Sequence, residues 1–166
     1  MIKSVLIPKE RVAVLIGEKG ASKRTIEKAT STKLIISDEE VEISGESLDI
    51  LTAENIIKAI GRGFSPENAL LLLKEENALD IIQLPKNNLE KLRSRVIGAK
   101  GKSRYTIENL TQTKISVYGK TVSIIGEYEK VYAAREAIEK LINGFTHKSV
   151  YAFLESKQSA LRSDRV

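Results

Sequence analysis

An internal repeat constrains the fold of this chain more than any other feature. When the sequence is compared with itself at an offset of 81 residues, the separation of Gly17 from Gly98, residues coincide in one unbroken register. The coinciding segments are Ile16-Gly17 and Ile97-Gly98, Gly20 and Gly101, Thr25-Ile26-Glu27 and Thr106-Ile107-Glu108, Thr32-Lys33 and Thr113-Lys114, Gly45 and Gly126, and Gly63-Phe64 and Gly144-Phe145. Self-similarity at one fixed period indicates a repeated structural unit. We therefore expect two copies of one small unit.

Each copy shows the same predicted order: strand, helix, glycine pair, helix, strand, strand, helix. The first strand is a β-rich run, 5–7 or 81–84, that a proline closes. The other predicted elements are the helices 21–29 and 102–110 and the strands 34–36, 41–44, 115–117 and 122–125. In the last helix of the first copy, the apolar positions Ile50, Ala53, Ile57 and Ile60 follow helical spacing. This pattern predicts an α+β unit in which helices cover a three-stranded sheet.

The two copies differ in one length. Pro8 precedes Gly17 by nine residues, whereas Pro85 precedes Gly98 by thirteen. Four additional residues are about one helical turn. The first helix of the second copy is therefore expected to be longer by one turn, with Asn87 or Asn88 as its N-cap.

A helical segment is predicted between the copies. Ser65-Pro66-Glu67 is typical of a helix start, with a serine cap and a proline in the first turn. Residues 69–73, Ala-Leu-Leu-Leu-Leu, would expose several leucines to water as a free linker. We therefore expect this segment to be buried between the two units, which would then form one rigid body.

A matching segment follows the second copy, where Val150, Phe153 and Leu154 lie at helical spacing. The predicted organisation is thus a first domain at 1–64, an interdomain helical segment at 65–77, a second domain at 78–145, and a C-terminal helix and tail at 146–166.

The glycine pair is the motif that carries chemistry. A single Gly-x-x-Gly is weak evidence, because a helix C-cap followed by a turn gives the same pattern. Two copies in register, each between two predicted helices, indicate that the glycine pair has a function beyond ending a helix. Glycine lets two backbones approach closely, and the N–H groups that begin the next helix favour phosphate oxygens. Beside the motif, Ile16 or Ile97 provides an apolar wall for unstacked bases.

With its glycine pairs between helices, the chain resembles the type I KH domain, present twice. The residues from Arg95-Val96-Ile97-Gly98 through Tyr105-Thr106-Ile107-Glu108-Asn109 to Gly126, with the tail Ser163-Asp164-Arg165-Val166, resemble the partner-of-Nob family of small-subunit ribosome-assembly factors. This resemblance implies two tandem βααββα domains, each with a three-stranded antiparallel sheet covered by three helices. It also implies binding to single-stranded rRNA near the 3′ end of the small subunit, beside the Nob endonuclease and other assembly factors. Eukaryotic members lack the first glycine motif, so its presence here indicates an archaeal-type member.

The charges around the two motifs differ. Between residues 91 and 104 there are six basic residues and no acidic one: Lys91, Arg93, Arg95, Lys100, Lys102 and Arg104. In the first copy, Glu18 lies inside the glycine motif, and Asp38-Glu39-Glu40 occupy a turn where the second copy has Tyr118-Gly119-Lys120. In the KH family that turn borders the nucleic-acid groove, so we expect the second unit to carry most of the RNA affinity. The predicted RNA-binding residues are Arg95, Ile97, Gly98, Ala99, Lys100, Gly101, Lys102, Arg104 and Lys120, with Ile16, Gly17, Glu18, Lys19, Gly20 and Lys23.

Two other functions compete with RNA binding. Gly101-Lys102-Ser103 resembles the end of an ATPase P-loop, but that motif needs a glycine where Val96 stands and a strand before the loop. Titration with a nucleotide would distinguish this enzyme. The other alternative is a KH-fold protein-docking module with little RNA affinity, in which Tyr151, Phe153 and Leu154 contact a partner.

Composition narrows the remaining classes of function. The chain has no cysteine and one histidine, His147, so we expect no thiol catalysis, metal site or cofactor, and His147 is expected to be a solvated residue after a helix end. Aromatic content of 5% without tryptophan argues against the stacking platforms of RRM and OB domains. The longest apolar run is too short for a bilayer, and a net charge of +5 suits nucleic acid. We expect a cytoplasmic RNA-binding protein that is not an enzyme, with no membrane or small-molecule partner.

Overall fold

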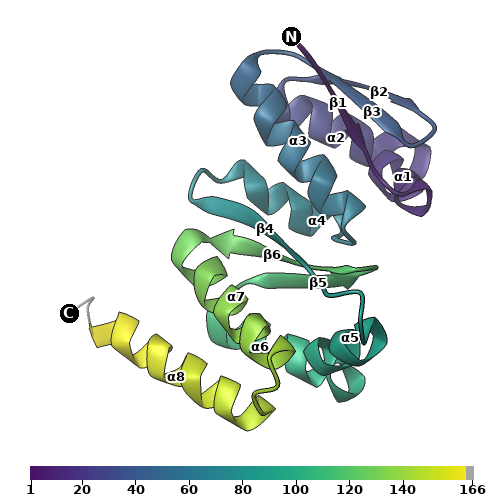
Figure 1. Cartoon of the computed structure of the whole chain (residues 1–166). Helices are drawn as coiled ribbons and strands as arrows, with labels where there is room; N and C mark the ends of the chain where they lie inside the picture. The colour runs from purple at the N-terminus through teal and green to yellow at the C-terminus, as the bar shows by residue number, and fades with distance from the viewer. Residues whose placement is uncertain (164–166) are drawn as a thin grey trace. The chain divides into compact units, whose positions relative to one another are not determined.

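The chain folds into two compact units, Met1–Leu79 and Asp80–Val166. The computed structural model describes the backbone of residues 1–163 and the side chains of residues 1–160, so tail residues 164–166 lie outside the described residues. Each unit has one three-stranded antiparallel sheet, with strand order β1-β3-β2 in the first and β4-β6-β5 in the second. Figure 1 shows the helices of each unit packed on one face of its sheet. The predicted α+β fold of two repeated units is confirmed.

The first unit follows the predicted order of elements. Its elements are β1 (Ile2–Leu6), α1 (Lys9–Ile16), a 3₁₀ turn η1 (Glu18–Gly20), α2 (Ala21–Thr30), β2 (Lys33–Ser37), β3 (Glu40–Ser44), α3 (Ser47–Gly61), α4 (Pro66–Ala69) and a second 3₁₀ turn, η2 (Leu70–Leu73). The central strand β3 pairs antiparallel with β1 and β2. Alternate residues of β3, Val41 and Ile43, are fully buried, and they face the helices together with Leu34 of β2.

The second unit repeats this architecture. Its elements are β4 (Asn77–Gln83), α5 (Leu89–Ile97), a 3₁₀ turn η3 (Ala99–Gly101), α6 (Lys102–Thr111), β5 (Lys114–Tyr118), β6 (Thr121–Glu127), α7 (Tyr128–Ile142) and α8 (His147–Ser163). Val122 and Ile124 of β6 are buried at the positions of Val41 and Ile43. The strand β4 begins four residues earlier than the sequence predicts, at Asn77.

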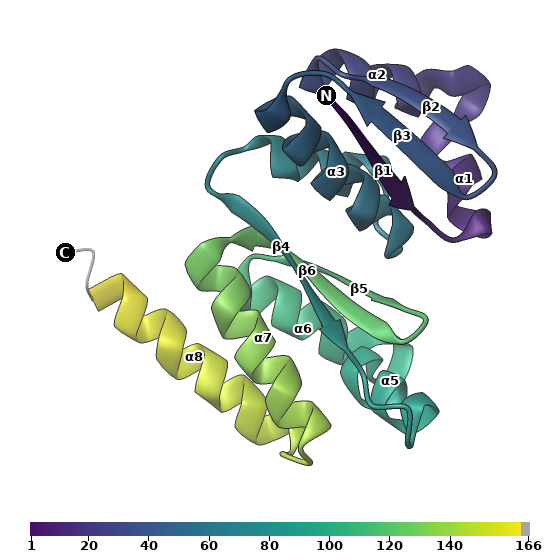
Figure 2. The same cartoon turned by 45° about the horizontal axis from the view of Figure 1, so that its top comes forward.

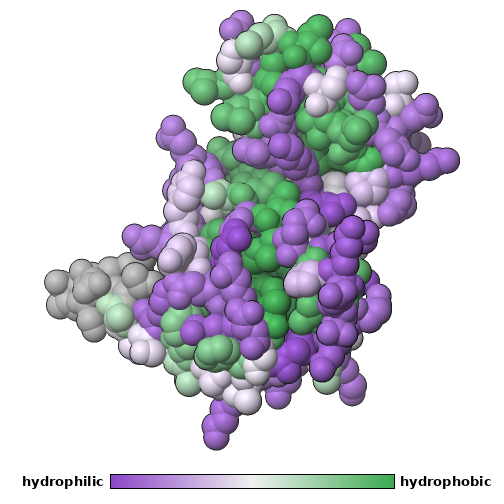
Figure 3. Space-filling view, in the orientation of Figure 1, coloured by the Kyte–Doolittle hydropathy of each residue, from purple (hydrophilic) through white to green (hydrophobic). Residues whose placement is uncertain are grey.

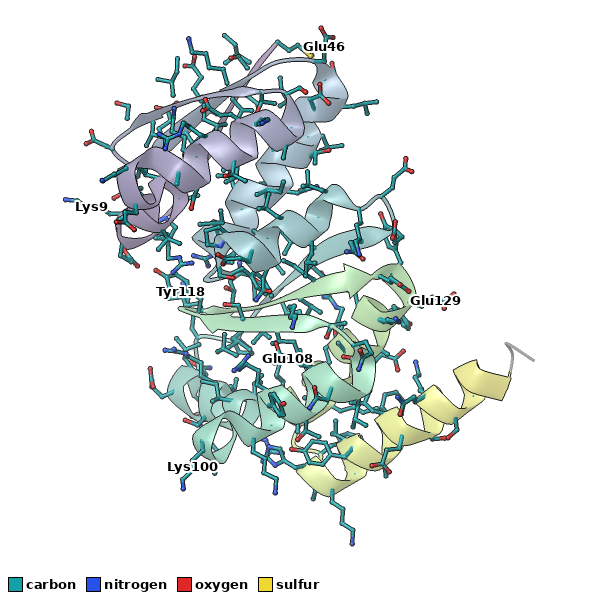
Figure 4. The ribbon with its side chains drawn as sticks, turned by 180° about the vertical axis from the view of Figure 1, so that it is seen from behind. Lys9, Glu46, Lys100, Glu108, Tyr118 and Glu129 are labelled. Atoms are coloured by element: carbon teal, nitrogen blue, oxygen red, sulfur yellow. The ribbon has the colours of Figure 1, made fainter. Side chains whose placement is uncertain are left out.

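A half-buried glutamate carboxylate connects helix to strand in both units. The Oε2 atom of Glu27 accepts a hydrogen bond from the backbone N of Leu34 at 2.9 Å. In the second unit, Oε2 of Glu108 accepts from the backbone N of Ile115 at 2.7 Å. Each glutamate thus satisfies a strand N–H group that has no partner in the sheet, which explains why both copies keep it. Figure 4 shows Glu108 on α6.

The predicted lengthening of the first helix in the second unit is wrong. Helix α5 has nine residues and α1 has eight, so the helices differ by one residue. Pro8 directly precedes α1, whereas residues 86–88 form a turn between Pro85 and α5. Asn88 does lie at the N-cap, but its φ of 62° is left-handed and its side chain makes no capping hydrogen bond. The additional residues therefore extend a loop, which Asn tolerates because it readily adopts the left-handed conformation.

The segment predicted between the two copies, which lies within the first unit, begins as expected. The side chain of Ser65 accepts a hydrogen bond from the backbone N of Asn68 at 3.2 Å, and Pro66 lies in the first turn. The helix α4 ends after four residues, and the 3₁₀ turn η2 continues it. Both pack against α3, and Leu72 is buried. That this segment joins the two units into one rigid body stays a prediction.

The glycine loops have the same backbone in both units. Gly17 and Gly98 have φ near 75° and ψ near 175°, a conformation that is almost restricted to glycine. A Cβ atom at Gly98 would lie 2.6 Å from Cβ of Ser103 and 2.7 Å from its backbone N. Gly17 approaches Ser22 in the same way, with a Cβ atom only 2.5 Å from the serine Oγ. The first glycine of each pair is therefore required both by its dihedral angles and by contact with the next helix.

Replacement of the two glycines in one loop is expected to have unequal effects. Gly98→Ala should lower the free energy of unfolding by about 2–4 kcal/mol, because the methyl group meets Ser103 and the backbone is strained. At Gly101 a Cβ atom meets nothing within 4 Å. Gly101→Ala should therefore cost only the left-handed conformation, roughly 1–2 kcal/mol. Urea unfolding followed by circular dichroism measures both losses, and equal losses would show that Ser103 does not restrict residue 98.

The 3₁₀ turn η2 offers a matched pair of leucines. Leu72 is 8% exposed and Leu73 is 42% exposed. Leu72→Asp should destabilise the protein by about 2–4 kcal/mol, because a charge is forced into an apolar contact, whereas Leu73→Asp should cost less than about 1 kcal/mol. Thermal unfolding tests the pair. Limited proteolysis tests the predicted joining of the units, and cleavage within 66–74 that releases two stable halves would contradict it.

Candidate nucleic-acid interface

A groove of about 770 Å³ lies on the first unit and reaches Ile16, the residue before Gly17. Its lining comes from the end of β1, from α1 and from the turn between β2 and β3, and comprises Leu6, Lys9, Val12, Ala13, Ile16, Ser37, Asp38, Glu39 and Glu40. One wall is therefore mainly apolar and suits the faces of bases. The opposite wall carries three carboxylates, which disfavour a phosphate chain.

The second unit holds its turn at the same place. The backbone N of Ile7 donates to the carbonyl O of Glu39 at 3.0 Å, and the backbone N of Leu84 donates to the carbonyl O of Lys120 at 2.8 Å. Lys120 thus takes the structural position of Glu39. Tyr118, labelled in Figure 4, ends β5 directly before this turn. The second unit therefore has the ammonium group of Lys120 where the first unit has the carboxylate of Glu39 beside its groove.

Both glycine loops present backbone N–H groups and a lysine. Gly20 and Gly101 are the N-cap residues of α2 and α6, and neither helix start has a side-chain cap. Lys19 and Lys100 lie between the glycines, with φ of 54° and 55°. Both lysines are exposed, and Figure 4 shows Lys100 at the outer edge of its unit. A helix start without a side-chain cap, next to an exposed ammonium group, favours an anion.

The structure brings most of the predicted residues together at the two loops. Residues 16–20 form one continuous surface segment, and residues 97–102 form its counterpart. Hydrophilic side chains cover the region of α5 in Figure 3. The exposed charge at the second loop comes from Lys100 and Lys102, since Ala99 replaces Glu18 there.

Three basic residues that were predicted to bind RNA instead bond with their charged groups to partners within their own unit. Lys23 pairs with Glu27 at 3.5 Å, and Arg104 pairs with Glu108 at 3.1 Å. The guanidinium of Arg95 donates from Nε to the carbonyl O of Leu141 at 3.0 Å and from Nη2 to that of Phe145. These side chains stabilise the framework around the loops.

Sequence reasoning missed two kinds of residue in the loop framework. Ser22 and Ser103 lie under the first glycines, and their repetition in register was an available signal. His147 had no such signal: it follows the end of α7, as expected, but it is not fully solvated. It begins α8, is half-buried, and its Nε2 atom lies 2.8 Å from the carbonyl O of Arg95.

Two further features bear on the class of function. No helix in the described part of the chain combines the length and apolar character needed to cross a bilayer. Within those same residues, no group of three or more His, Asp or Glu side chains is arranged to hold a metal ion.

Comparison with known proteins matches these features to one family. A model of the eukaryotic-type KH domain, KH-domain type I, matches residues 9–78 and again residues 75–159. A KH domain-containing protein of Methanocaldococcus jannaschii is 45% identical over 99% of this chain and 77% of its own length. The RNA-binding protein pno1 of Dictyostelium discoideum is 31% identical over 70% of this chain. The match covers 52% of that relative, so this chain spans about half the length of such eukaryotic proteins.

Solved structures agree with the sequence comparison. Dim2p from Pyrococcus horikoshii has a TM-score of 0.90 at 46% identity, with 94% of this chain and 99% of that chain covered. The same comparison finds aDim2p in a complex with a/eIF2alpha and rRNA, at a TM-score of 0.92 and 45% identity, with 96% of this chain and 95% of that chain covered. The family model spans both units, and the identity extends over nearly the whole chain. This chain therefore belongs to the partner-of-Nob (PNO1) family of tandem type I KH-domain proteins.

Proposed function

We propose that this protein binds single-stranded rRNA of the small ribosomal subunit, near its 3′ end, during ribosome assembly and pre-rRNA processing. The observation that carries the proposal is the pair of glycine loops, each opening a helix without a side-chain cap. Relatives support the RNA class, since they include RNA-binding proteins and pre-rRNA-processing proteins. A structural neighbour was solved in a complex that contains rRNA.

The chemistry of binding follows from the loop. Backbone N–H groups at the start of α6 point toward the position of a phosphate, and Lys100 and Lys102 supply positive charge beside it. At Gly101 a Cβ atom would meet nothing within 4 Å, so the absent side chain there leaves open space for the RNA backbone to approach the loop. Splayed bases then contact the apolar wall that begins at Ile97. Binding of this kind needs no cofactor, and we propose that the protein acts by binding and not by catalysis.

The second unit is proposed to carry most of the RNA affinity. Two unit charges about 4 Å apart interact by roughly 1–4 kcal/mol near a protein surface. The turn of the first unit has Glu39 where the second unit has Lys120, so the interaction of this position with a phosphate changes from repulsion to attraction. The first groove is also lined by the carboxylates of Asp38 and Glu40. The predicted RNA-binding residues of the first unit would then contribute less.

Protein partners are proposed from the relatives. The Nob endonuclease and other assembly factors are the partners that the family resemblance implies, and the neighbouring complex contains a/eIF2alpha. The RNA held by the second unit would be presented to such an enzyme.

The two competing functions have less support. The segment Gly101-Lys102-Ser103 follows helix α5, whereas a P-loop follows a strand. In the docking-module alternative, Leu154 would contact a partner, but it is 2% exposed and packs in the core of the second unit.

Single-stranded RNA is expected to bind with micromolar or tighter affinity, and duplex RNA of the same sequence only weakly. A KH groove holds roughly four splayed nucleotides, whose base edges a duplex conceals. Affinity should fall with salt along a shallow slope, because few phosphates are contacted. Fluorescence anisotropy with a labelled oligonucleotide measures both. Equal affinity for the duplex would contradict the proposal.

Aspartates in the two glycine loops are expected to act unequally. Ala99→Asp with Lys100→Asp should abolish most RNA binding, because two carboxylates would face the phosphate. The matched double change, Glu18→Asp with Lys19→Asp, should cost much less. Both proteins should remain folded, because these positions are exposed and aspartate tolerates the left-handed conformation at residues 19 and 100. Circular dichroism provides the control. Loss of binding only in the first-unit variant would show that the first groove is the main RNA site.

A further inference from the structure

The two units differ in the element that follows their last long helix. At the offset of the repeat, α4 begins at Pro66 and α8 begins at His147. The first segment has four α-helical residues, whereas α8 has seventeen. Helix α8 packs against α6 and α7, with Val150 and Leu154 buried, and Figure 2 shows it alongside α7. Only the second unit therefore carries a long additional helix of this kind.

The first turn of α8 contacts the end of helix α5. The Nε2 atom of His147 lies 2.8 Å from the carbonyl O of Arg95, in the last turn of α5. The final carbonyls of a helix have no partner within the helix, so an outside donor such as this one satisfies them. Gly98 follows Arg95 by three residues. In the first unit the residue equivalent to His147 is Pro66, whose side chain has no donor.

The side chain of Arg95 adds a second connection at the same point. Its guanidinium donates to the carbonyls of Leu141 and Phe145, at the end of α7 and just before α8. In the first unit Arg11 makes the equivalent bonds to Ile60 and Phe64, each at 2.7 Å. Arg11 lies in the first turn of α1, six residues before Gly17. An arginine that connects the end of the first helix to the end of the last long helix is thus a feature of the second unit, whereas in the first unit Arg24 of α2 donates to the carbonyl O of Lys19 at 2.7 Å.

From these contacts we propose that α8 positions the second glycine loop for RNA, with His147 and Arg95 as positioning residues. The inference rests on the proposed RNA-binding function and deepens it. Lys100 holds a left-handed φ of 55°, and contacts around the loop must offset the free energy that this conformation costs. A loop that is ordered before binding avoids the entropy cost of ordering on contact with RNA. The last turn of α5 is where that order is imposed.

The experiment compares His147→Ala with His147→Gln, because the glutamine Nε2 atom is also a donor. In the protein without RNA, amide hydrogen exchange of residues 98–103 is expected to be about ten-fold faster in H147A, in proportion to one lost hydrogen bond, and near wild type in H147Q. Residues 17–22 of the first unit serve as the internal control and should not change.

RNA affinity supplies the second measurement. H147A should weaken binding about three- to ten-fold with the salt slope of the wild type, since no phosphate contact is removed, and H147Q should restore the affinity. Lys100→Ala is the contrasting variant. It removes a charge that faces the phosphate, so it should lower the slope.

Three outcomes separate the possibilities. Unchanged exchange of residues 98–103 in H147A would overturn the positioning role. Equal loss of affinity in H147A and H147Q with a lower salt slope would also overturn it, because His147 would then contact the RNA itself. If the wild-type protein bound no single-stranded RNA, the proposed function would fail, while the exchange measurement would still decide whether α8 orders the loop.

Discussion

The close approach of two backbones at the first glycine of each loop is the constraint on which the interface depends. Gly98 contacts Ser103 so closely that no side chain fits between them, and Gly17 contacts Ser22 in the same way. This contact directs the second helix away from the first within a few residues. The second glycine, Gly20 or Gly101, is the N-cap residue of that helix, so the helix start has no side-chain cap, and an exposed lysine precedes it. The anion binding that we propose for the loop therefore depends on both glycines, one for packing and one for the uncapped helix start.

The same backbone can have different electrostatic properties in its two copies. Both units hold the turn between their last two strands against the end of the first strand, by equivalent hydrogen bonds of 3.0 and 2.8 Å. The turn carries Glu39 in one unit and Lys120 in the other, so one geometry places opposite charges beside the groove. Charge at this turn can change without loss of the fold, because only the backbone of the turn is used to hold it. We propose that this freedom gives the two KH units of this chain different affinities for RNA.

In both units an arginine contacts the end of the last long helix, but the repeat does not align the two arginines. At the end of α3, and again at the end of α7, an arginine of the first helix donates one hydrogen bond to each of two backbone carbonyls. Arg11 and Arg95 differ in their distance from the glycine loop by three residues, about one helical turn. Both arginines reach the same carbonyls because residues one turn apart share a helix face. In the second unit this shift places the arginine that contacts the end of α7 three residues before the glycine loop.

The sequence by itself determined the repeat, the order of elements, the glycine loops and the family. These depend on periodicity and on backbone conformations that few residues accept, and both can be read from neighbouring positions. The tertiary structure decided that three of the four extra residues, 86–88, enlarge the loop before α5 and that only one lengthens the helix, since helix length there depends on packing. It also decided the roles of Arg95 and His147, whose partners lie 46 to 52 residues away in the chain. Contacts over such separations leave no periodic pattern, so only the folded chain shows that Arg95 donates to the end of α7 and that His147 donates to the end of α5.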